Sequence, residues 1–277
     1  MSTETKSRMS IGAVTSGIVA APIKTLVYGP EGVGKTSFAA GAPSPIFIPI
    51  EEGTNHLPVA RFPAPETFQD VLDAITELGR TEHPYRTLVL DTLDALEPLI
   101  WEHVVRQAGK PDKIKSIEDF GYGKGYIAAL DSWRLLLAYL EKLRRVKQIN
   151  VVMLAHSQIK KFQNPEGEDF DRFELKLAGK GASGVVKEWS DNVLFATYEV
   201  IASTDKDTDR TRGFSTGKRV ARTTHSGAFD AKNRYSLPDP LELSWAAYRD
   251  GMKAYLTANQ QSQQSQQSNQ QQKKEEK

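Results

Sequence analysis

The stretch Gly29-Pro30-Glu31-Gly32-Val33-Gly34-Lys35-Thr36 decides the fold, because it matches the phosphate-loop pattern G-x-x-x-x-G-K-[ST] in full. A largely apolar run at 23–28 precedes it, and Ser-Phe-Ala-Ala-Gly at 37–41 suits the first turns of a helix. A glycine-rich turn between a strand and a helix directs backbone N–H groups inward at the positive end of the helix dipole. A plain glycine turn is the alternative. The flanking strand and helix signals favour a site for a nucleoside triphosphate.

The residue types of this motif have distinct chemical tasks. Lys35 is expected to reach the β- and γ-phosphates, and the Thr36 hydroxyl is expected to be a ligand of Mg²⁺. The residues predicted to contact the nucleotide are Gly29, Pro30, Glu31, Gly32, Val33, Gly34, Lys35, Thr36 and Ser37.

A second motif, Leu88-Val89-Leu90-Asp91-Thr92, is an apolar strand that ends in an acid, the Walker B pattern. We expect Asp91 to hold Mg²⁺ through water, and Thr92 to cap the following helix. The alternative is that Asp91 serves only as a helix cap. Its place after a phosphate loop makes Asp91 the best metal-site candidate.

The composition is that of a soluble globular protein with a real core, since 39% of the 277 residues are hydrophobic and 26% are charged. A formal charge of +1 means that any nucleic-acid surface must be local. The lack of cysteine excludes disulfides, thiolate zinc sites and cysteine nucleophiles. No apolar stretch is long enough to span a bilayer and the N-terminus shows no signal peptide, so we expect a cytoplasmic protein without a membrane partner.

The chain divides into three parts. Residues 1–20 are polar, then small, and are predicted to form a flexible arm. Residues 21–256 are predicted to form one ATPase domain. The segment 257–277 is almost entirely Gln, Ser and Asn before a charged end, and this composition predicts a disordered tail.

Strands and helices alternate within 21–256, which predicts an α/β fold with a mainly parallel sheet flanked by helices. C-terminal β-hairpins are expected over 201–243. The strands are expected at 23–28, 46–50, 87–91, 149–155 and 192–200. The helices are expected at 67–79 with Thr67 as its cap, from 93 with Pro98 inside it, at 126–147 with Ile127 and Trp133 on its inner stripe, and at 244–256. A polar loop is expected at 109–125.

Polar residues follow two of these strands. Glu51 and Glu52 end the second strand, and one of them is the candidate base that activates the attacking water. The residues alone do not choose between them. His156, Ser157 and Gln158 end the fourth strand and are placed to sense the γ-phosphate. The alternative is that His156 only forms structural hydrogen bonds at the end of its strand.

The order of these motifs resembles that of the RecA-like ATPases, most of all the compact phage-encoded members that act as single-strand annealing or recombination proteins. The resemblance covers about 20–250. The residues that carry it are GPEGVGKTS (29–37), IEEGT (50–54), TLVLDT (87–92), FGYGKGY (120–126), VVMLAHSQIKK (151–161) and AKNRY (231–235).

This resemblance implies several further features. The five strands, numbered along the chain, would lie in the order 5-1-4-3-2. Catalysis would rest on Glu52 of the E-G-T segment, with Gln158 at the start of the second DNA loop and His156 as a further sensor. Lys232 and Arg234 match a K-x-R pair that reaches a neighbour's nucleotide, so ATP would lie at a subunit interface of a ring or filament.

The loops 109–125 and 159–183 would bind single-stranded DNA. Their aromatic and basic residues are the candidate contacts, although 159–183 has a net charge of zero and phosphate binding favours basic segments. A clearer basic cluster at 210–222 is either a DNA track or the solvated face of a hairpin. The candidate DNA contacts are Tyr122, Lys124, Lys160, Lys161, Phe162, Arg172, Lys176 and Lys180, and the basic cluster is Arg210, Arg212, Lys218, Arg219 and Arg222.

The sequence thus predicts an oligomeric, Mg²⁺-dependent ATPase that binds single-stranded DNA and promotes annealing or homologous recombination. Its partners would be single-stranded DNA, other copies of the chain and a single-stranded DNA-binding protein, in a host cytoplasm if the chain is phage-encoded. One alternative is a DNA annealer that binds ATP with little or no turnover. Another is a ring-forming helicase or helicase loader, which the K-x-R pair fits equally well.

Overall fold

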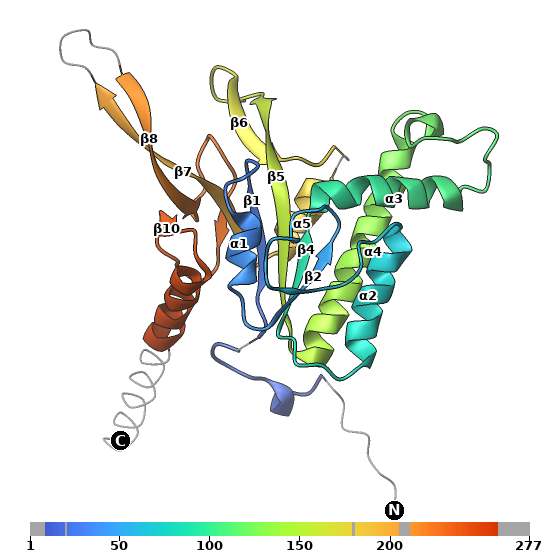
Figure 1. Ribbon diagram of the computed structural model, residues 1–277, viewed down its shortest axis with the longest axis horizontal. Coiled ribbons are helices and arrows are strands. Elements are labelled where there is room, and N and C mark those ends of the chain that lie inside the picture. The colour runs from blue at the N-terminus through green and yellow to red at the C-terminus, as the bar shows by residue number, and fades with distance from the viewer. Residues whose placement is uncertain (1–8, 20, 179–180, 205–210, 260–277) are drawn as a thin grey trace, which may run out of the picture.

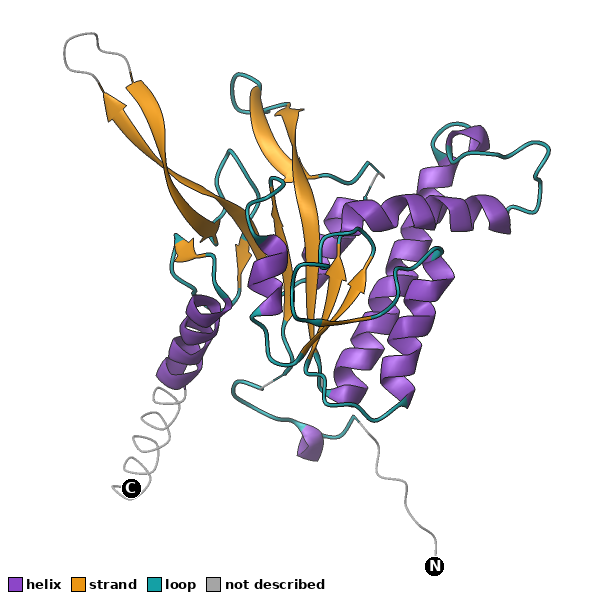
Figure 2. Ribbon diagram, viewed as in Figure 1, coloured by secondary structure: helices purple, strands orange, loops and turns teal. Residues whose placement is uncertain are grey.

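The computed structural model describes residues 9–19, 21–178, 181–204 and 211–259. Its centre is a twisted sheet in which most neighbouring strands are parallel, with helices on both faces (Figures 1 and 2). The strands are β1 (Lys24–Gly29), β2 (Pro45–Pro49), β3 (Ala60–Arg61), β4 (Thr87–Asp91), β5 (Asn150–Phe162), β6 (Phe170–Leu175), β7 (Asn192–Thr204), β8 (Thr211–Arg222), β9 (Lys232–Asn233) and β10 (Leu241–Glu242). The helices are η1 (Ile11–Ala13), α1 (Lys35–Ala40), α2 (Phe68–Arg80), α3 (Leu93–Gln107), η2 (Glu118–Phe120), α4 (Lys124–Lys147), α5 (Ala182–Trp189) and a last helix at 245–259.

The strand order confirms the prediction. The five predicted strands correspond to β1, β2, β4, β5 and β7, and the sheet runs β10-β8-β7-β1-β5-β4-β2-β3, which contains the order 5-1-4-3-2. These five strands pair in parallel. Parallel strands are buried on both faces, which explains why they appear in the sequence as continuous apolar runs. The strand β8 adds to β7 in an antiparallel sense and forms the predicted C-terminal hairpin.

Two hydrophobic clusters cover the two faces of the sheet. On one face, α2, α3 and α4 pack around side chains such as Trp133. On the other face, Phe38 of α1 packs against Trp245 and Tyr248 of the last helix, with ring centroids 5.3 and 5.7 Å apart. The last helix is thereby part of the same core as the phosphate-loop helix. No helix among the described residues has the length and apolar character needed to cross a membrane.

The start of α2 was predicted correctly from its capping residues, whereas the buried face of α4 was predicted only in part. The Thr67 hydroxyl accepts the Asp70 backbone N–H, and the Asp70 carboxylate accepts the Thr67 N–H, so α2 begins with the capping box typical of such a start. In α4, by contrast, Ile127 is exposed and Ala129 is buried in its place, while Trp133 is buried as predicted. The last helix continues to residue 259, three residues into the predicted tail, and 260–277 lie outside the described residues.

The largest difference from the prediction concerns 159–183, which was expected to be a loop. The strand β5 continues to Phe162 and pairs with β6, from Ser157 opposite Leu175 to Phe162 opposite Phe170. The rings of Phe162 and Phe170 lie 5.2 Å apart and close the end of this hairpin. The lysines in the second half of β5 made this segment look like a loop in the sequence. They belong instead to a solvent-exposed two-stranded ribbon, where charged side chains are tolerated.

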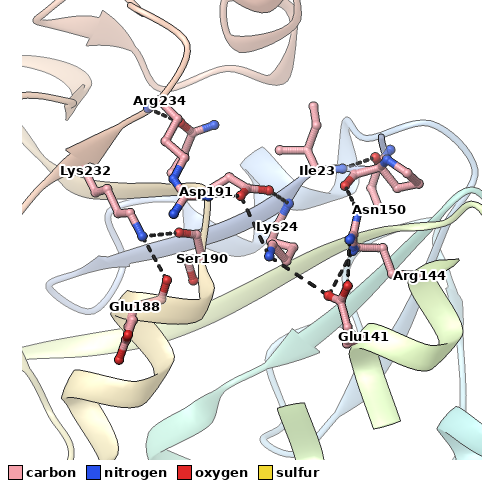
Figure 3. A network of polar contacts seen from close by, with 12 residues as sticks. Ile23, Lys24, Glu141, Arg144, Asn150, Glu188, Ser190, Asp191, Lys232 and Arg234 are labelled. Atoms are coloured by element: carbon pink, nitrogen blue, oxygen red, sulfur yellow. Dashed lines mark hydrogen bonds and ion pairs between the residues drawn. The ribbon is translucent and has the colours of Figure 1, made fainter. Parts of the chain in front are cut away.

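A polar network joins β1, α4 and the start of β7 at the amino end of the parallel strands (Figure 3). Glu141 accepts hydrogen bonds from Arg144 and Arg145, and Lys24 lies between Glu141 and Asp191. Hydrogen bonding from Arg144 is the main cause that lowers the pKa of Glu141 to about 2, although partial burial opposes it.

This shift predicts how stability depends on pH. Because the pKa of Glu141 is lower in the folded state than in the unfolded chain, its stabilisation is present above about pH 4.5 and is lost as the pH falls toward 2. We expect Glu141→Gln to lower the free energy of unfolding by about 2 kcal/mol at pH 7, with the deficit shrinking toward pH 3. Urea unfolding of both proteins across this range measures it. Glu102→Gln, which removes an exposed pair with Arg106, is the control and should change little. A deficit that is equal at all pH values would contradict the prediction.

Candidate functional site

The phosphate loop connects β1 to α1 at the carboxyl end of the sheet, as predicted. Gly32 and Gly34 have φ values of +71° and +101°, a region that residues with a Cβ rarely adopt. The Lys35 Nζ donates to the carbonyl oxygens of Gly29 and Pro30 at 3.1 and 2.9 Å. Burial lowers the pKa of Lys35, while neighbouring carboxylates act to raise it.

A cavity of about 440 Å³ lies over this loop. Acidic, basic and small residues of several strands converge on it, as expected of a site for a polyanion with a metal. Its lining consists of Glu31, Gly32, Gly34, Lys35, Thr36, Ser37, Glu51, Glu52, Gly53, His56, His156 and Arg219.

The two predicted metal-site residues meet in the structure. The Thr36 hydroxyl donates to Asp91 Oδ2 at 2.9 Å, although 55 residues separate them in the chain. Asp91 is fully buried, and its Oδ1 has no hydrogen-bond partner among the described residues. Burial raises the pKa of Asp91 to about 6, and the hydrogen bond from Thr36 opposes the rise. A buried carboxylate with an unpaired oxygen favours a bound cation at this position.

The surroundings of Asp91 fit Mg²⁺, a cation that prefers oxygen ligands. A methyl carbon built on Gly53 would lie 3.7 Å from Asp91 Oδ2, 3.9 Å from Thr36 Oγ1 and 3.9 Å from Glu51 Oε1. Hydroxyl and carboxylate oxygens thus surround one small space that the absence of a side chain at Gly53 leaves open. When bound there, Mg²⁺ would neutralise charge on the phosphate oxygens.

The two candidate bases differ in position. Glu51 is half-buried, and its Oε1 faces the same space beside Gly53 as the Thr36 and Asp91 oxygens, whereas Glu52 is exposed. Both line the cavity. The geometry therefore favours Glu51, while the resemblance of the E-G-T segment had favoured Glu52. In a turn after a strand, the direction of a side chain depends on the conformation of the turn's backbone. The E-G-T motif alone does not specify that direction.

Asp94 is a site residue that the sequence reasoning missed. It accepts the His156 backbone N–H at 2.8 Å through Oδ1 and contacts His156 Nδ1 at 2.8 Å through Oδ2. These hydrogen bonds outweigh burial and hold the pKa of Asp94 below its usual value. One ligand atom each of Glu51, Asp94 and His156 lie within 4.8 Å of one another. The available signal was an acid in the first turn of the helix after the Walker B strand.

Gln158 lies away from this cluster. It belongs to β5, and its Nε2 donates to the Leu175 carbonyl at 2.9 Å across the β5–β6 hairpin. It does not line the cavity, unlike His156. Gln158 could therefore respond to ATP only indirectly, through a movement of the β5–β6 hairpin.

Lys232 and Arg234 lie at the amino end of the sheet (Figure 3). The Lys232 ammonium donates to carbonyls at the end of α5, among them Ser190 at 2.6 Å, and Arg234 pairs with Asp191 at 3.0 Å. Asp191 in turn contacts Lys24, the first residue of β1. The length of β1, about 17 Å, separates this pair from the phosphate loop of the same chain. The prediction that the pair reaches a neighbour's nucleotide stays a prediction.

The structure separates the candidate DNA contacts into two groups. Tyr122, Lys124, Lys160, Lys161 and Lys176 are exposed. Lys180 lies outside the described residues.

Arg172 and Phe162 form the second group, and for Arg172 the prediction was wrong. Arg172 is buried and pairs with Asp230, a residue 58 positions away that also binds Lys187. The Arg172 guanidinium lies over the Phe162 ring, 5.0 Å from its centroid, and that ring also packs on Phe170. A buried arginine with a paired carboxylate supports the hairpin and is not available to DNA.

The basic cluster at 210–222 lies on β8. Arg210 is outside the described residues. Lys218 and Arg219 are exposed, and Arg222 is half-buried. Successive side chains of a regular strand point to opposite faces, so Arg219 and Arg222, which are three residues apart in the regular part of β8, point to opposite faces.

Among the comparisons with known proteins, a family model covers most of the chain. The family model described as an AAA domain (AAA_24) matches residues 21–235. No match was found among curated proteins. Among solved structures, a crystal structure of the RadB recombinase is similar, with 15% sequence identity and a TM-score of 0.42, over 75% of this chain and 84% of that one. The family model spans most of the chain and includes the phosphate loop, Asp91 and the K-x-R pair. The chain therefore belongs to the AAA domain family.

Proposed function

We propose that this chain is a Mg²⁺-dependent ATPase that binds single-stranded DNA and promotes strand annealing or homologous recombination. The observation that carries the proposal is the course of β5. This strand passes His156 at the nucleotide cavity and continues without interruption to Lys160 and Lys161 on an exposed hairpin. One rigid element thus joins a site suited to ATP with a surface suited to a polyanion.

The hydrolysis step is assigned to residues that meet at the cavity. Lys35 and the backbone of the phosphate loop bind the phosphates, and Thr36 with Asp91 holds Mg²⁺. Glu51, with Glu52 as the alternative, accepts a proton from the attacking water. His156 is held by Asp94 and senses the γ-phosphate.

The path from ATP to DNA runs along the sheet. Gly29, at the start of the phosphate loop, is the register partner of His156. Beyond it, the β5–β6 hairpin projects from the same edge of the sheet as the phosphate loop (Figure 1). A shift of His156 toward or away from the γ-phosphate would therefore tilt the base of this hairpin and change its affinity for DNA.

The DNA surface is assigned to exposed residues only. Lys160 has no ion pair among the described residues, and Lys161 pairs with Asp169 at 3.4 Å. In the segment before α4, Tyr122 is fully exposed beside Lys124 and is suited to stacking on a base. The lysines contribute sequence-independent attraction to phosphates, as single-strand binding requires.

ATP is proposed to lie between subunits, with Arg234 of one chain reaching the nucleotide of the next. The Arg234 side chain is about half exposed, although one of its nitrogens pairs with Asp191. It lies at the edge of the sheet opposite the phosphate loop, as a contact to a second copy would require. A ring or filament in a host cytoplasm, with a single-stranded DNA-binding protein as a further partner, completes the proposal.

The proposal is tested by single-stranded DNA binding as a function of salt, with ATP, ADP or no nucleotide. We expect tighter binding with ATP than with ADP. The double variant Lys160→Ala and Lys161→Ala should lower the slope of log K against log salt by about 1.4, since each phosphate contact contributes about 0.7 on single strands.

The matched control is Lys142→Ala with Lys253→Ala, which removes the same charge from exposed positions on α4 and the last helix. It should leave the slope nearly unchanged. Binding that is the same in all three nucleotide states, or an equal effect of both double variants, would count against the proposal. Turnover measured with and without DNA separates a working ATPase from an annealer that only binds ATP.

A further inference from the structure

The β7–β8 hairpin lies against the phosphate loop on the side away from the metal site. Tyr198 of β7 and Arg219 of β8 are register partners across this hairpin. The Tyr198 hydroxyl lies 3.4 Å from the Gly32 carbonyl oxygen, so it contacts the loop directly. Arg219 lies over Gly34 and lines the same cavity as Lys35 and Thr36.

The contact between Arg219 and Gly34 is close. A methyl carbon built on Gly34 would lie 2.6 Å from Arg219 Nη1 and 3.5 Å from its Cδ. A side chain at position 34 would require the guanidinium to move from this position. The guanidinium thus lies beside Gly34 of the phosphate loop, whose backbone N–H groups are expected to bind phosphates.

Arg219 also differs from other arginines of the chain in what it contacts. Arg144, Arg172 and Arg234 each form an ion pair with a carboxylate. Arg219 has no ion pair with any residue that the structure describes, and its side chain is exposed to the cavity. Lys35, the other cation there, donates to two carbonyl groups of the loop. The guanidinium of Arg219 therefore has donors free for an anionic ligand.

We propose that Arg219 binds the phosphate chain of the nucleotide in its own subunit, at the α- and β-phosphates, and that Tyr198 positions the hairpin for this contact. The inference rests on the proposed nucleotide binding. A guanidinium offers a planar fork of N–H donors that matches two phosphate oxygens, and such charge-assisted hydrogen bonds are stronger than neutral ones.

The order of the strands indicates which phosphates are contacted. Asp91 is the last residue of β4 and Glu51 follows β2. Both strands lie to one side of β1, whereas Arg219 comes from β8 on the other side. The γ-phosphate belongs at the metal and the candidate base, so the phosphate chain crosses the end of β1 from the β4 side toward the β8 side. Gly34 and Arg219 lie at the far end of this path, where the loop binds the α- and β-phosphates.

The test compares the affinities of Arg219→Ala, Arg219→Lys and Lys218→Ala for ATP and for ADP, measured by calorimetry in the presence of Mg²⁺. Lys218 is the neighbouring exposed residue on β8, and it does not line the cavity. We expect Arg219→Ala to weaken both nucleotides by about 10- to 100-fold. Arg219→Lys should recover part of this loss, because it keeps the charge without the fork, and Lys218→Ala should bind like the unmodified protein.

Melting temperatures distinguish binding from packing. Arg219→Ala should melt close to the unmodified protein without nucleotide and show a smaller rise in melting temperature with ATP. An unchanged rise together with lower stability of the free protein would make Arg219 a packing residue and overturn the inference. A loss confined to ATP would place the contact at the γ-phosphate and overturn the assignment to the α- and β-phosphates.

The outcome for Lys35→Ala separates this inference from the proposed function. If the unmodified protein binds ATP, Lys35→Ala does not, and Arg219→Ala binds normally, only the role of Arg219 fails. If the unmodified protein does not bind ATP, the proposed function fails and the inference fails with it.

Discussion

Glu51→Gln is expected to lower ATP turnover by about 100-fold or more while leaving ATP affinity nearly unchanged. The Glu51 Oε1 faces the same space beside Gly53 as the oxygens of Thr36 and Asp91, and it lies close to the Asp94–His156 pair. A glutamine keeps the size of this side chain but cannot accept a proton from water. Removing the charge also relieves repulsion with Asp91, whose pKa the Glu51 carboxylate helps to raise. Binding of the nucleotide with Mg²⁺ should therefore survive the change.

Glu52→Gln is the matched comparison, because it makes the same chemical change one residue further along. Glu52 is exposed on the rim of the cavity, and the variant should keep most of the turnover. Steady-state phosphate release, with ATP affinity measured separately, gives both quantities. The opposite result, with a loss in Glu52→Gln and normal turnover in Glu51→Gln, would assign the base to Glu52, as the resemblance implies.

Lys35→Ala is expected to abolish measurable ATP binding, and with it the rise in melting temperature that ATP produces. At a ligand concentration of 100 Kd this rise corresponds to about 2.7 kcal/mol of stabilisation in the unmodified protein. Lys35 is only 5% exposed and is the motif's own cation at the phosphates. Its loss should destabilise the free protein little, because the ammonium loses hydration on burial, which also lowers its pKa.

Differential scanning of the variant with and without ATP and Mg²⁺ measures this effect, and Lys142→Ala on α4 serves as the control. A normal ATP-induced rise in Lys35→Ala would exclude the phosphate loop as the nucleotide site.

The same variant tests the subunit interface. Mixed with Arg234→Ala, it should regain part of the turnover if an intact Arg234 of one chain acts on ATP bound to an intact loop of another. Absence of recovery in mixed oligomers would contradict that arrangement.

Much of the fold was predictable because its signals are local or simple. Buried parallel strands appear as unbroken apolar runs, and the Thr67–Asp70 capping box marks the start of α2 within four residues. The phosphate loop and Asp91 were predicted from residue types and spacing, and the structure brings Thr36 and Asp91 within hydrogen-bond distance. The strand order came from the resemblance, and the observed sheet confirms it.

The sequence by itself therefore determined the class of fold, the phosphate loop and the acid beside it. Tertiary structure alone decided that Glu51 lies nearer the metal-site oxygens than Glu52, that Asp94 holds His156, and that Arg172 is buried against Asp230. It also decided that Arg219 of β8, one member of a basic cluster, packs against Gly34 of the phosphate loop. One physical reason explains all of these cases. The direction of a side chain at a strand end, and its contacts with residues far away in the chain, depend on how the strands pair. Local residue patterns do not encode that pairing.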